Sequence, residues 1–531
     1  MNRRPRRHKA SQGPRDRRRT LPVVLIGALA LVACAPATDA AWRPAAFPAA
    51  RVAVTEFPAA IDPATVPALR PMRIRNDEVG VQARVALLPG RTPLNDRVVG
   101  AVREAIGARE AATGVAYAPQ VQSRGAGLGE RMCIAGSTRL PAAELLTDPR
   151  LGPANGSGTA VACDIVAAAG PYLGVRVRTV SGDATAIGGD TSITLYTDLR
   201  SGETVSADAL WTSEAGPALW GDIVEALRRD AGALSLAPVQ PPDEAGLAVI
   251  GAALARSVPA GDAVVVEVPA GFSPLELQAL GIAATTEPMP VAVPVEVATP
   301  YLTPFGAGLV GAVASALPYE APAIIPAGAD AIDCELVPCV ALTYDDGPSE
   351  YTSGILHELG ARGAAATFYV LGEKARGWAD TLRRMRDEGH EIANHSWNHP
   401  SLPSLTDEQV AAQLRDTSAA IQNVVGTRPT NFRPPYGEYN QNVLRIAGLP
   451  AILWDVDTFD YQRPEVDTLI SRAVDAPRPG SIVLMHDIHP GTAAAAAATY
   501  DGLLDRGFSL VTVTQIFEGD VPASGAWTSG R

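Results

Sequence analysis

The sequence has few basic residues once its first twenty residues are set aside. Those twenty hold nine Lys or Arg and one acid, and the next fourteen hold no charged residue. The rest of the chain carries 35 basic and 56 acidic residues, which is a net charge of −21. Because binding to nucleic acid needs clustered Lys and Arg against the phosphates, so acidic a body argues against a nucleic-acid partner.

Cysteine is also scarce, and none of the five falls in a Cys-x-x-Cys spacing, which argues against a zinc site built on cysteine. In an exported chain we expect cysteines to pair. Cys334 and Cys339 lie close together, and Cys133 and Cys163 both lie in the N-terminal half. Two disulfides are therefore predicted, and Cys34 is left over.

The apolar run at residues 21–33 follows the basic segment and is too short to cross a bilayer comfortably, which is typical of a signal peptide. It ends Leu-Val-Ala-Cys, which resembles the lipobox of bacterial lipoproteins, where the cysteine is lipidated. We expect residues 1–34 to be a signal peptide and Cys34 to carry the lipid. Ordinary cleavage near Cys34, which would secrete the chain, is the alternative. The arginine pair at 18–19 leaves twin-arginine export open.

A chain of 531 residues is too long for one core, so two or three domains are expected. Residues 35–71 are rich in Ala and Pro, which predicts a tether. Residues 317–332 contain three prolines and a glycine, which predicts an interdomain linker. An α+β domain is expected at 72–316 and a second domain at 333–520.

The 72–316 region has no histidine and no evident metal constellation. Its predicted strands are Thr191–Leu199, Val175–Val180, Val264–Val268 and Val291–Val297, and its predicted helices are Asn95–Ala108 and Asp222–Leu234. A scaffold and a ligand-binding role are both open for this separate extracytoplasmic domain.

From Cys334 onward, short β-type runs alternate with helical stretches. The predicted strands are Val340–Tyr344, Ala365–Leu371, His390–Asn394, Asn431–Arg433, Ala451–Asp455, Ser481–His486 and Ser509–Val513. The helical stretches include Thr381–Glu388, Thr406–Val425 and Val466–Ala473. This alternation predicts an α/β domain of parallel strands, as an irregular (β/α)7-type barrel. Active sites of such barrels form at the C-terminal strand ends.

The first of these strands ends in Asp345 and Asp346, and Gly347 and Pro348 then turn the chain. Neighbouring side chains of a strand point to opposite faces, so one carboxylate can bind a metal while the other faces a substrate. A turn without chemistry is the simpler interpretation of these four residues alone.

Polar residues follow the later strand ends as well. His395 and His399 are four apart, and with Asp346 they make a two-imidazole, one-carboxylate set that leaves coordination positions open for a catalytic metal. Arg433, held by two prolines, can clamp a carboxylate and keep it ionised. His486 at another strand end can act as a general acid tuned by a carboxylate.

Five blocks of the sequence resemble, in order, the motifs of the NodB-type polysaccharide deacetylases, carbohydrate esterase family 4. The blocks are Thr-Tyr-Asp-Asp-Gly-Pro, His-Ser-Trp-Asn-His, Arg-Pro-Pro-Tyr-Gly, Asp-Thr-Phe-Asp-Tyr and Leu-Met-His. The resemblance covers about residues 334 to 517. It implies a NodB-like barrel and removal of acetyl groups from a polysaccharide.

The resemblance also implies a role for each matched residue. Asp346, His395 and His399 would hold Zn²⁺ or another divalent transition metal such as Co²⁺. Asp345 would be the general base, oriented by Arg433, and His486 would be the general acid, tuned by Asp460. The backbone N–H of Tyr436 would stabilise the oxyanion. Leu484 and Tyr461 would line the acetyl pocket, where Tyr461 departs from the tryptophan that is usual in the family.

The expected substrate is an N-acetylated cell-wall polysaccharide. Peptidoglycan comes first, because a lipoprotein on the outer face of the bacterial cytoplasmic membrane, or a protein secreted to the wall, meets it first. Chitin-like oligomers and O-acetylated xylan are alternatives. A non-catalytic wall-binding or sensing lipoprotein is the rival from another class, and contact with the membrane is expected only through the N-terminal lipid.

Overall fold

The computed structural model describes residues 50–233, 237–519 and 521–530. Their contacts group residues 50–531 into one compact unit. The predicted signal peptide, the lipobox-like Cys34 and most of the predicted tether lie outside the described residues. No helix within the described ranges is long and apolar enough to cross a membrane.

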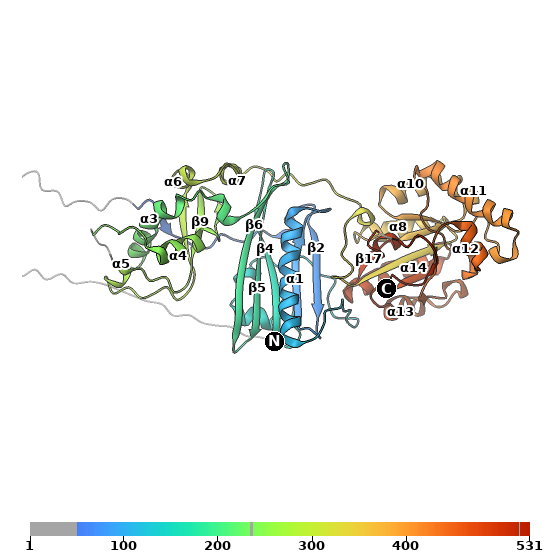
Figure 1. The fold of residues 1–531 in the computed structure, drawn as a ribbon, viewed down its shortest axis with the longest axis horizontal. Coiled ribbons are helices and arrows are strands. Elements are labelled where there is room, and N and C mark those ends of the chain that lie inside the picture. The colour runs from blue at the N-terminus through green and yellow to red at the C-terminus, as the bar shows by residue number, and fades with distance from the viewer. Residues whose placement is uncertain (1–49, 234–236, 520, 531) are drawn as a thin grey trace, which may run out of the picture. The chain divides into compact units, whose positions relative to one another are not determined.

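The N-terminal part of this unit contains two sheets (Figure 1). The six-stranded sheet has the order β2 (Arg70–Asn76), β3 (Val81–Leu87), β4 (Ser157–Ala169), β5 (Tyr172–Asp183), β6 (Ile187–Asp198) and β7 (Thr204–Ser206). The four-stranded sheet has the order β1 (Ala53–Val54), β10 (Met289–Pro294), β9 (Ala263–Val268) and β8 (Val258–Ala260). Every pairing is antiparallel except that of β3 with β4.

Helices cover these sheets because their apolar side chains recur at helical spacing. Helix α1 (Pro93–Thr113) runs along the six-stranded sheet and buries Leu94, Val98 and Val102 against it (Figure 1). Its Thr92 side chain caps the first turn. The other helices of this part are α2 (Ala142–Thr147), α3 (Ala215–Asp230), α4 (Glu244–Leu254), α5 (Leu275–Gln278), α6 (Val295–Ala298) and α7 (Pro304–Ala314).

Two predicted boundaries are wrong. The tether was expected to reach residue 71, but Val52 and Val66 are buried, β1 pairs with β10, and β2 begins at Arg70. Very short strands carry too little periodicity to stand out from an Ala- and Pro-rich stretch. The C-terminal domain was expected to end at residue 520, but β18 (Ala526–Trp527) pairs with β14 (Ala451–Ile452).

The C-terminal part is an α/β arrangement of parallel strands. Strand β11 (Cys339–Asp345) lies between β12 (Thr367–Val370) and β16 (Ile482–His486), and β17 (Ser509–Val511) pairs with its first half. Strand β13 (Glu391–Asn394) extends the row beyond β12, and β15 (Val456–Asp457) extends it beyond β16. Phe432 bridges β13 to β14. Closure of this row into a seven-stranded barrel stays a prediction.

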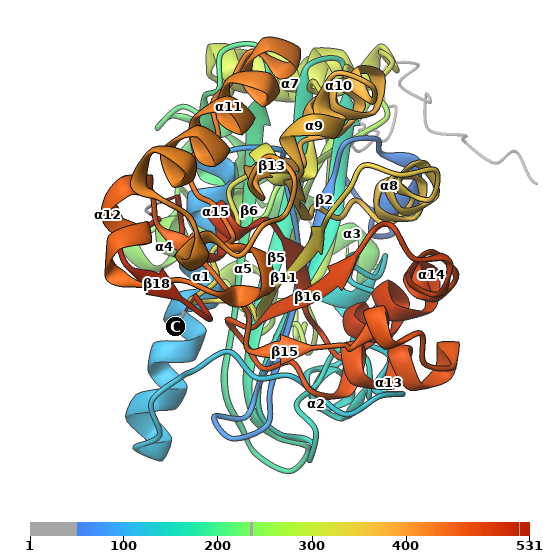
Figure 2. The same ribbon diagram turned by 90° about the vertical axis from the view of Figure 1, so that its right-hand side faces the viewer.

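Helices flank these strands: α13 contacts β15, α14 contacts β17, and α8 packs against α14, as Figure 2 shows on the right-hand side of the view. The helices are α8 (Thr352–Gly360), α9 (Gly372–Ala375), α10 (Ala379–Asp387), α11 (Asp407–Val425), α12 (Gln441–Ala447), α13 (Val466–Asp475), α14 (Pro490–Asp505) and α15 (Val513–Ile516). A capping box of Thr406 and Gln409 starts α11, whose predicted range begins at the same threonine. Because the strands are parallel, their C-terminal ends meet at one edge.

The structure contains both predicted disulfides, Cys133–Cys163 and Cys334–Cys339. All four cysteines are buried in the same apolar cluster. The first bridge closes 30 residues of chain and the second closes five.

Loop length predicts that the two bridges differ in their contribution to stability. On the chain-entropy estimate, removing Cys133–Cys163 as a double alanine variant should cost about 3.5 kcal/mol, and removing Cys334–Cys339 about 2 kcal/mol. The second variant is a matched control, because it also replaces two buried, disulfide-bonded cysteines. Denaturant unfolding of both variants measures the difference, and a larger loss for the Cys334–Cys339 variant would contradict the estimate.

Candidate active site

Three predicted metal ligands come together at the C-terminal edge of the strands. Asp346 directly follows β11, and His395 directly follows β13. The Oδ1 atom of Asp346 lies 3.5 Å from Nε2 of His395 and 3.4 Å from Nε2 of His399. That oxygen is buried, and it has no hydrogen-bond partner among the described residues.

These residues fit a divalent transition metal. Nδ1 of His395 lies 2.8 Å from the backbone oxygen of Arg433, so it carries the proton and leaves Nε2 free as a ligand atom. Burial lowers the pKa of His395 to about 3, which keeps the ring neutral. A carboxylate oxygen without a partner beside two imidazoles is a ligand set that suits Zn²⁺ and leaves positions open.

Left-handed backbone conformations gather in the loops of this site. Nine described non-glycine residues have positive φ, and six of them lie in these loops: Asp346 (72°), Ser396 (69°), His399 (63°), Tyr436 (61°), Phe459 (53°) and Arg463 (54°). Such conformations cost on the order of 1–3 kcal/mol each, and they cluster where function requires a fixed side-chain direction. Aspartate and histidine adopt this conformation more often than most residues, but none of these residue types requires it, so the sequence does not predict it.

Asp345, the last residue of β11, is buried and faces Arg433. Nη1 of Arg433 donates to Oδ1 of Asp345 at 2.9 Å and to the hydroxyl of Thr343 at 2.7 Å. Nε and Nη2 donate to the backbone oxygens of Ile452 and Leu453. These bonds fix the guanidinium, and through it the orientation of Asp345.

Two aromatic rings complete the surroundings of Arg433. Its guanidinium carbon lies 4.2 Å from the ring centre of Tyr369 and 5.5 Å from that of Trp454. Cation–π contacts of this kind stabilise a desolvated cation. Neither ring was predicted to belong to the site, since both stand in apolar runs that carry no motif.

The sequence predicts that Arg433 keeps a carboxylate ionised, but the pKa of Asp345 is raised. Burial raises the pKa of this carboxyl, and Arg433 opposes the shift without outweighing it. A carboxylate with a raised pKa is a stronger base than an exposed aspartate, which favours proton abstraction near neutral pH.

His486 ends β16, directly beside Asp345 in the strand register. Its Nδ1 lies 2.7 Å from Oδ1 of Asp460, and its backbone N–H donates to Oδ2 of Asp460. The hydroxyl of Thr492 also donates to Oδ2. Burial lowers the pKa of His486, but the hydrogen bond to Asp460 and the nearby negative charges raise it to about 9. The ring is therefore protonated at neutral pH.

Comparison with known proteins agrees with this geometry. The family model for polysaccharide deacetylase matches residues 334–449. The chitooligosaccharide deacetylase of Rhizobium leguminosarum bv. trifolii is 34% identical over 194 residues, which are 33% of this chain and 90% of that protein. The chain belongs to the polysaccharide deacetylase family.

For other relatives, the match to this chain covers a smaller share of the relative's length. The peptidoglycan-N-acetylmuramic acid deacetylase PdaC of Bacillus subtilis is 39% identical over 180 residues, which are 34% of this chain and 38% of PdaC. The solved structure of PdaC has 38% identity and a TM-score of 0.35, and the match covers 36% of this chain and 94% of that structure.

The remaining predicted site residues lie near these groups. The Tyr436 ring centre is 4.5 Å from that of His399, and the Tyr461 ring centre is 5.8 Å from that of His486. Both tyrosines are exposed, whereas Leu484 on β16 is buried. Their assignments to an oxyanion site and an acetyl pocket remain predictions.

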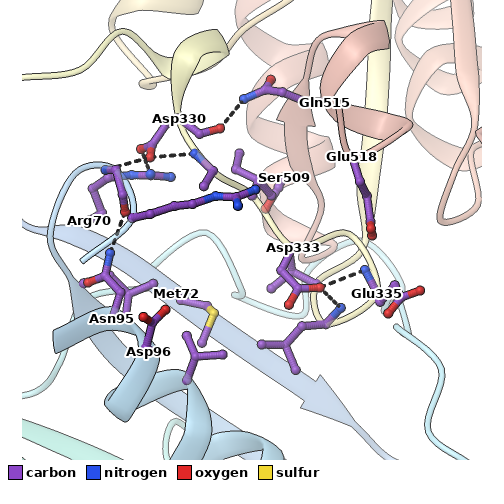
Figure 3. Close-up of a pocket in the computed structure, with 18 of the residues that line it drawn as sticks. Arg70, Met72, Asn95, Asp96, Asp330, Asp333, Glu335, Ser509, Gln515 and Glu518 are labelled. Carbon is purple, nitrogen blue, oxygen red and sulfur yellow. Dashed lines mark hydrogen bonds and ion pairs between the residues drawn. The ribbon is translucent and has the colours of Figure 1, made fainter. Parts of the chain in front are cut away.

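A cavity of about 870 Å³ lies away from these residues (Figure 3). It is lined by β2, α1, residues 328–337 and α15. Its wall pairs Asp330 with Arg70 and Asp333 with Arg103. None of the predicted site residues lines it, so we place the chemistry at the strand ends and not here.

The Asp460–His486 hydrogen bond predicts a specific titration. Asp460→Asn removes the negative charge that contributes most to raising the pKa of His486, so this pKa should fall from about 9 toward its ordinary value, with burial then opposed by the charges of Asp345 and Asp346. Asp457→Asn is the control, because Asp457 accepts from the Phe459 N–H and not from His486. NMR titration of the imidazole measures both variants. Equal pKa values in wild type and Asp460→Asn would contradict the assignment.

Proposed function

We propose that the chain is a metal-dependent hydrolase that removes N-acetyl groups from a cell-wall polysaccharide, with peptidoglycan amino sugars as the first substrate. One observation carries the proposal: a single edge of the sheet brings together a carboxylate held by a fixed arginine, three side chains that could hold a metal ion, and an imidazole hydrogen-bonded to a carboxylate. A wall-binding protein without catalysis would not need all three kinds of group at one edge.

The chemistry divides among these groups. A divalent ion bound by Asp346, His395 and His399 would supply Lewis-acid polarisation of the acetyl carbonyl and of water. Asp345 takes a proton from the attacking water as the new C–O bond forms. His486 gives a proton to the amine as the C–N bond breaks, so the products are acetate and a free amino sugar. The N–H of Tyr436 donates to the developing oxyanion.

Two further observations support a polysaccharide substrate. Five exposed aromatic side chains lie on the loops around the site: Trp397, Tyr436, Tyr439, Phe459 and Tyr461. Such rings offer apolar faces that can stack on sugar rings. The relatives PdaC of Bacillus subtilis and PgdA of Listeria monocytogenes are named for peptidoglycan, with N-acetylmuramic acid and N-acetylglucosamine as the respective sugars.

A second substrate class, chitin-like oligomers, is supported by two relatives named chitooligosaccharide deacetylase, of which this chain covers about 90% of the length. Release of acetate from purified peptidoglycan and from chitooligosaccharides, measured in parallel with added Zn²⁺, separates the two. Acetate from neither substrate would favour the wall-binding alternative.

The two adjacent aspartates should separate by their effects on metal and on rate. Asp346→Ala removes a ligand, so bound zinc and acetate release should both be lost. Asp345→Asn keeps the shape but removes the base, so zinc should remain while kcat falls on the order of 10²–10⁴-fold. Metal content and acetate release of each variant test this. Loss of zinc from Asp345→Asn as complete as from Asp346→Ala would show that the roles are misassigned.

We also propose that the protein acts outside the cell as a lipoprotein anchored through Cys34. The lipobox-like sequence motivates the anchor, and the two disulfides support an oxidising compartment. Cys34→Ala should move the protein from the membrane fraction to the medium or leave it unprocessed. Recovery of the wild type in the medium would favour ordinary secretion instead.

A further inference from the structure

Lysine is almost absent from this chain. It has 44 Lys and Arg, of which only Lys9 and Lys374 are lysine. Lys374 is therefore the only lysine among the described residues. It lies on α9, which follows β12 at the edge of the sheet that carries the site. Every other Lys or Arg position among the described residues is arginine, so the lysine at this position calls for a reason.

Lys374 contacts the backbone of a candidate metal ligand. Its Nζ donates to the backbone oxygen of Asp346 at 2.8 Å, across 28 residues of sequence. Asp346 has a left-handed backbone with φ of 72°. This conformation is uncommon for a residue with a side chain, although aspartate adopts it more often than most, so contacts from the surroundings help to hold it. The direction of its carboxylate depends on that conformation.

The turn that continues from Asp346 through Gly347 packs against Asp487. A Cβ atom at Gly347 would lie 2.1 Å from Oδ1 of Asp487, so the turn packs directly on this buried carboxyl. The hydroxyl of Thr352 donates to Oδ2 of Asp487, and that of Ser349 to its backbone oxygen. Burial raises the pKa of Asp487 to about 7, and the charge of Lys374 opposes this shift.

We propose that Lys374 is a positioning residue for Asp346, whose backbone carbonyl it holds so that the carboxylate faces His395 and His399. The inference rests on the proposed function, since it takes Asp346 as a metal ligand. An ammonium is a compact point charge on a flexible stem, whereas a guanidinium is a wider planar fork, so the two cations need different space beside the Asp346 carbonyl.

The test measures metal affinity and not activity. The full chain is stripped of metal, and its Zn²⁺ dissociation constant is measured by competition with a chromogenic chelator. Lys374→Met keeps the aliphatic stem and loses the ammonium, so the affinity should weaken about 10- to 100-fold, as for other groups that orient metal ligands. Lys374→Arg keeps a cation and should lose less Zn²⁺ affinity than Lys374→Met.

Arg386→Met is the matched control. Arg386 also donates to a backbone oxygen, that of Val425, but its partner lies away from the site. Its variant should bind Zn²⁺ as the wild type does. A Zn²⁺ dissociation constant of Lys374→Met within twofold of the wild-type value would overturn the inference. If Lys374→Met does not fold, Lys374→Gln is measured by the same criterion.

The outcome also separates this inference from the proposed function. If wild type binds Zn²⁺ and releases acetate while Lys374→Met keeps its affinity, only the positioning role fails. If wild type binds Zn²⁺ with the predicted sensitivity to Lys374 but releases no acetate, the deacetylase proposal fails and the positioning role stands. If wild type binds no Zn²⁺, both fail.

Discussion

The site depends on the separation of two adjacent carboxylates at the end of β11. Alternation along a strand would point Asp345 and Asp346 to opposite faces, but Asp346 has already left the strand. Its left-handed backbone turns the side chain away from that of Asp345, and Oδ1 of Asp346 lies within 3.5 Å of Nε2 of both histidines. Asp345 stays in the strand and meets Arg433. One carboxylate is thus available to a metal and the other to a proton.

The arrangement ties the site to the stability of the fold. Arg433 is fully buried and donates to two side chains and two backbone oxygens. Removing one partner of a buried ion pair costs about 3–5 kcal/mol, because the other charge stays without compensation. The two backbone oxygens belong to Ile452 and Leu453, and the Leu453 N–H donates to the oxygen of Trp527 on β18. The end of the chain therefore helps to hold the group that orients the base.

Much of this part could be predicted from the sequence, because a parallel sheet brings its strand ends to one edge. The strand that ends in Asp345 and the helix capped by Thr406 lie where their patterns place them. The contacts of Lys374 and Tyr369 could not be predicted, since they join residues far apart in sequence through side chains that carry no motif. The pairing of β18 could not be predicted either, because a strand of two residues is too short to show a strand period.

X-ray absorption spectroscopy at the zinc edge tests the central claim most directly, because it reports the ligands of a bound ion without assuming a substrate. Zinc should be bound stoichiometrically in a shell of nitrogen and oxygen, with two imidazoles and a carboxylate from Asp346, His395 and His399. A shell that contains sulfur or a single imidazole, or a protein that binds no zinc, would contradict it.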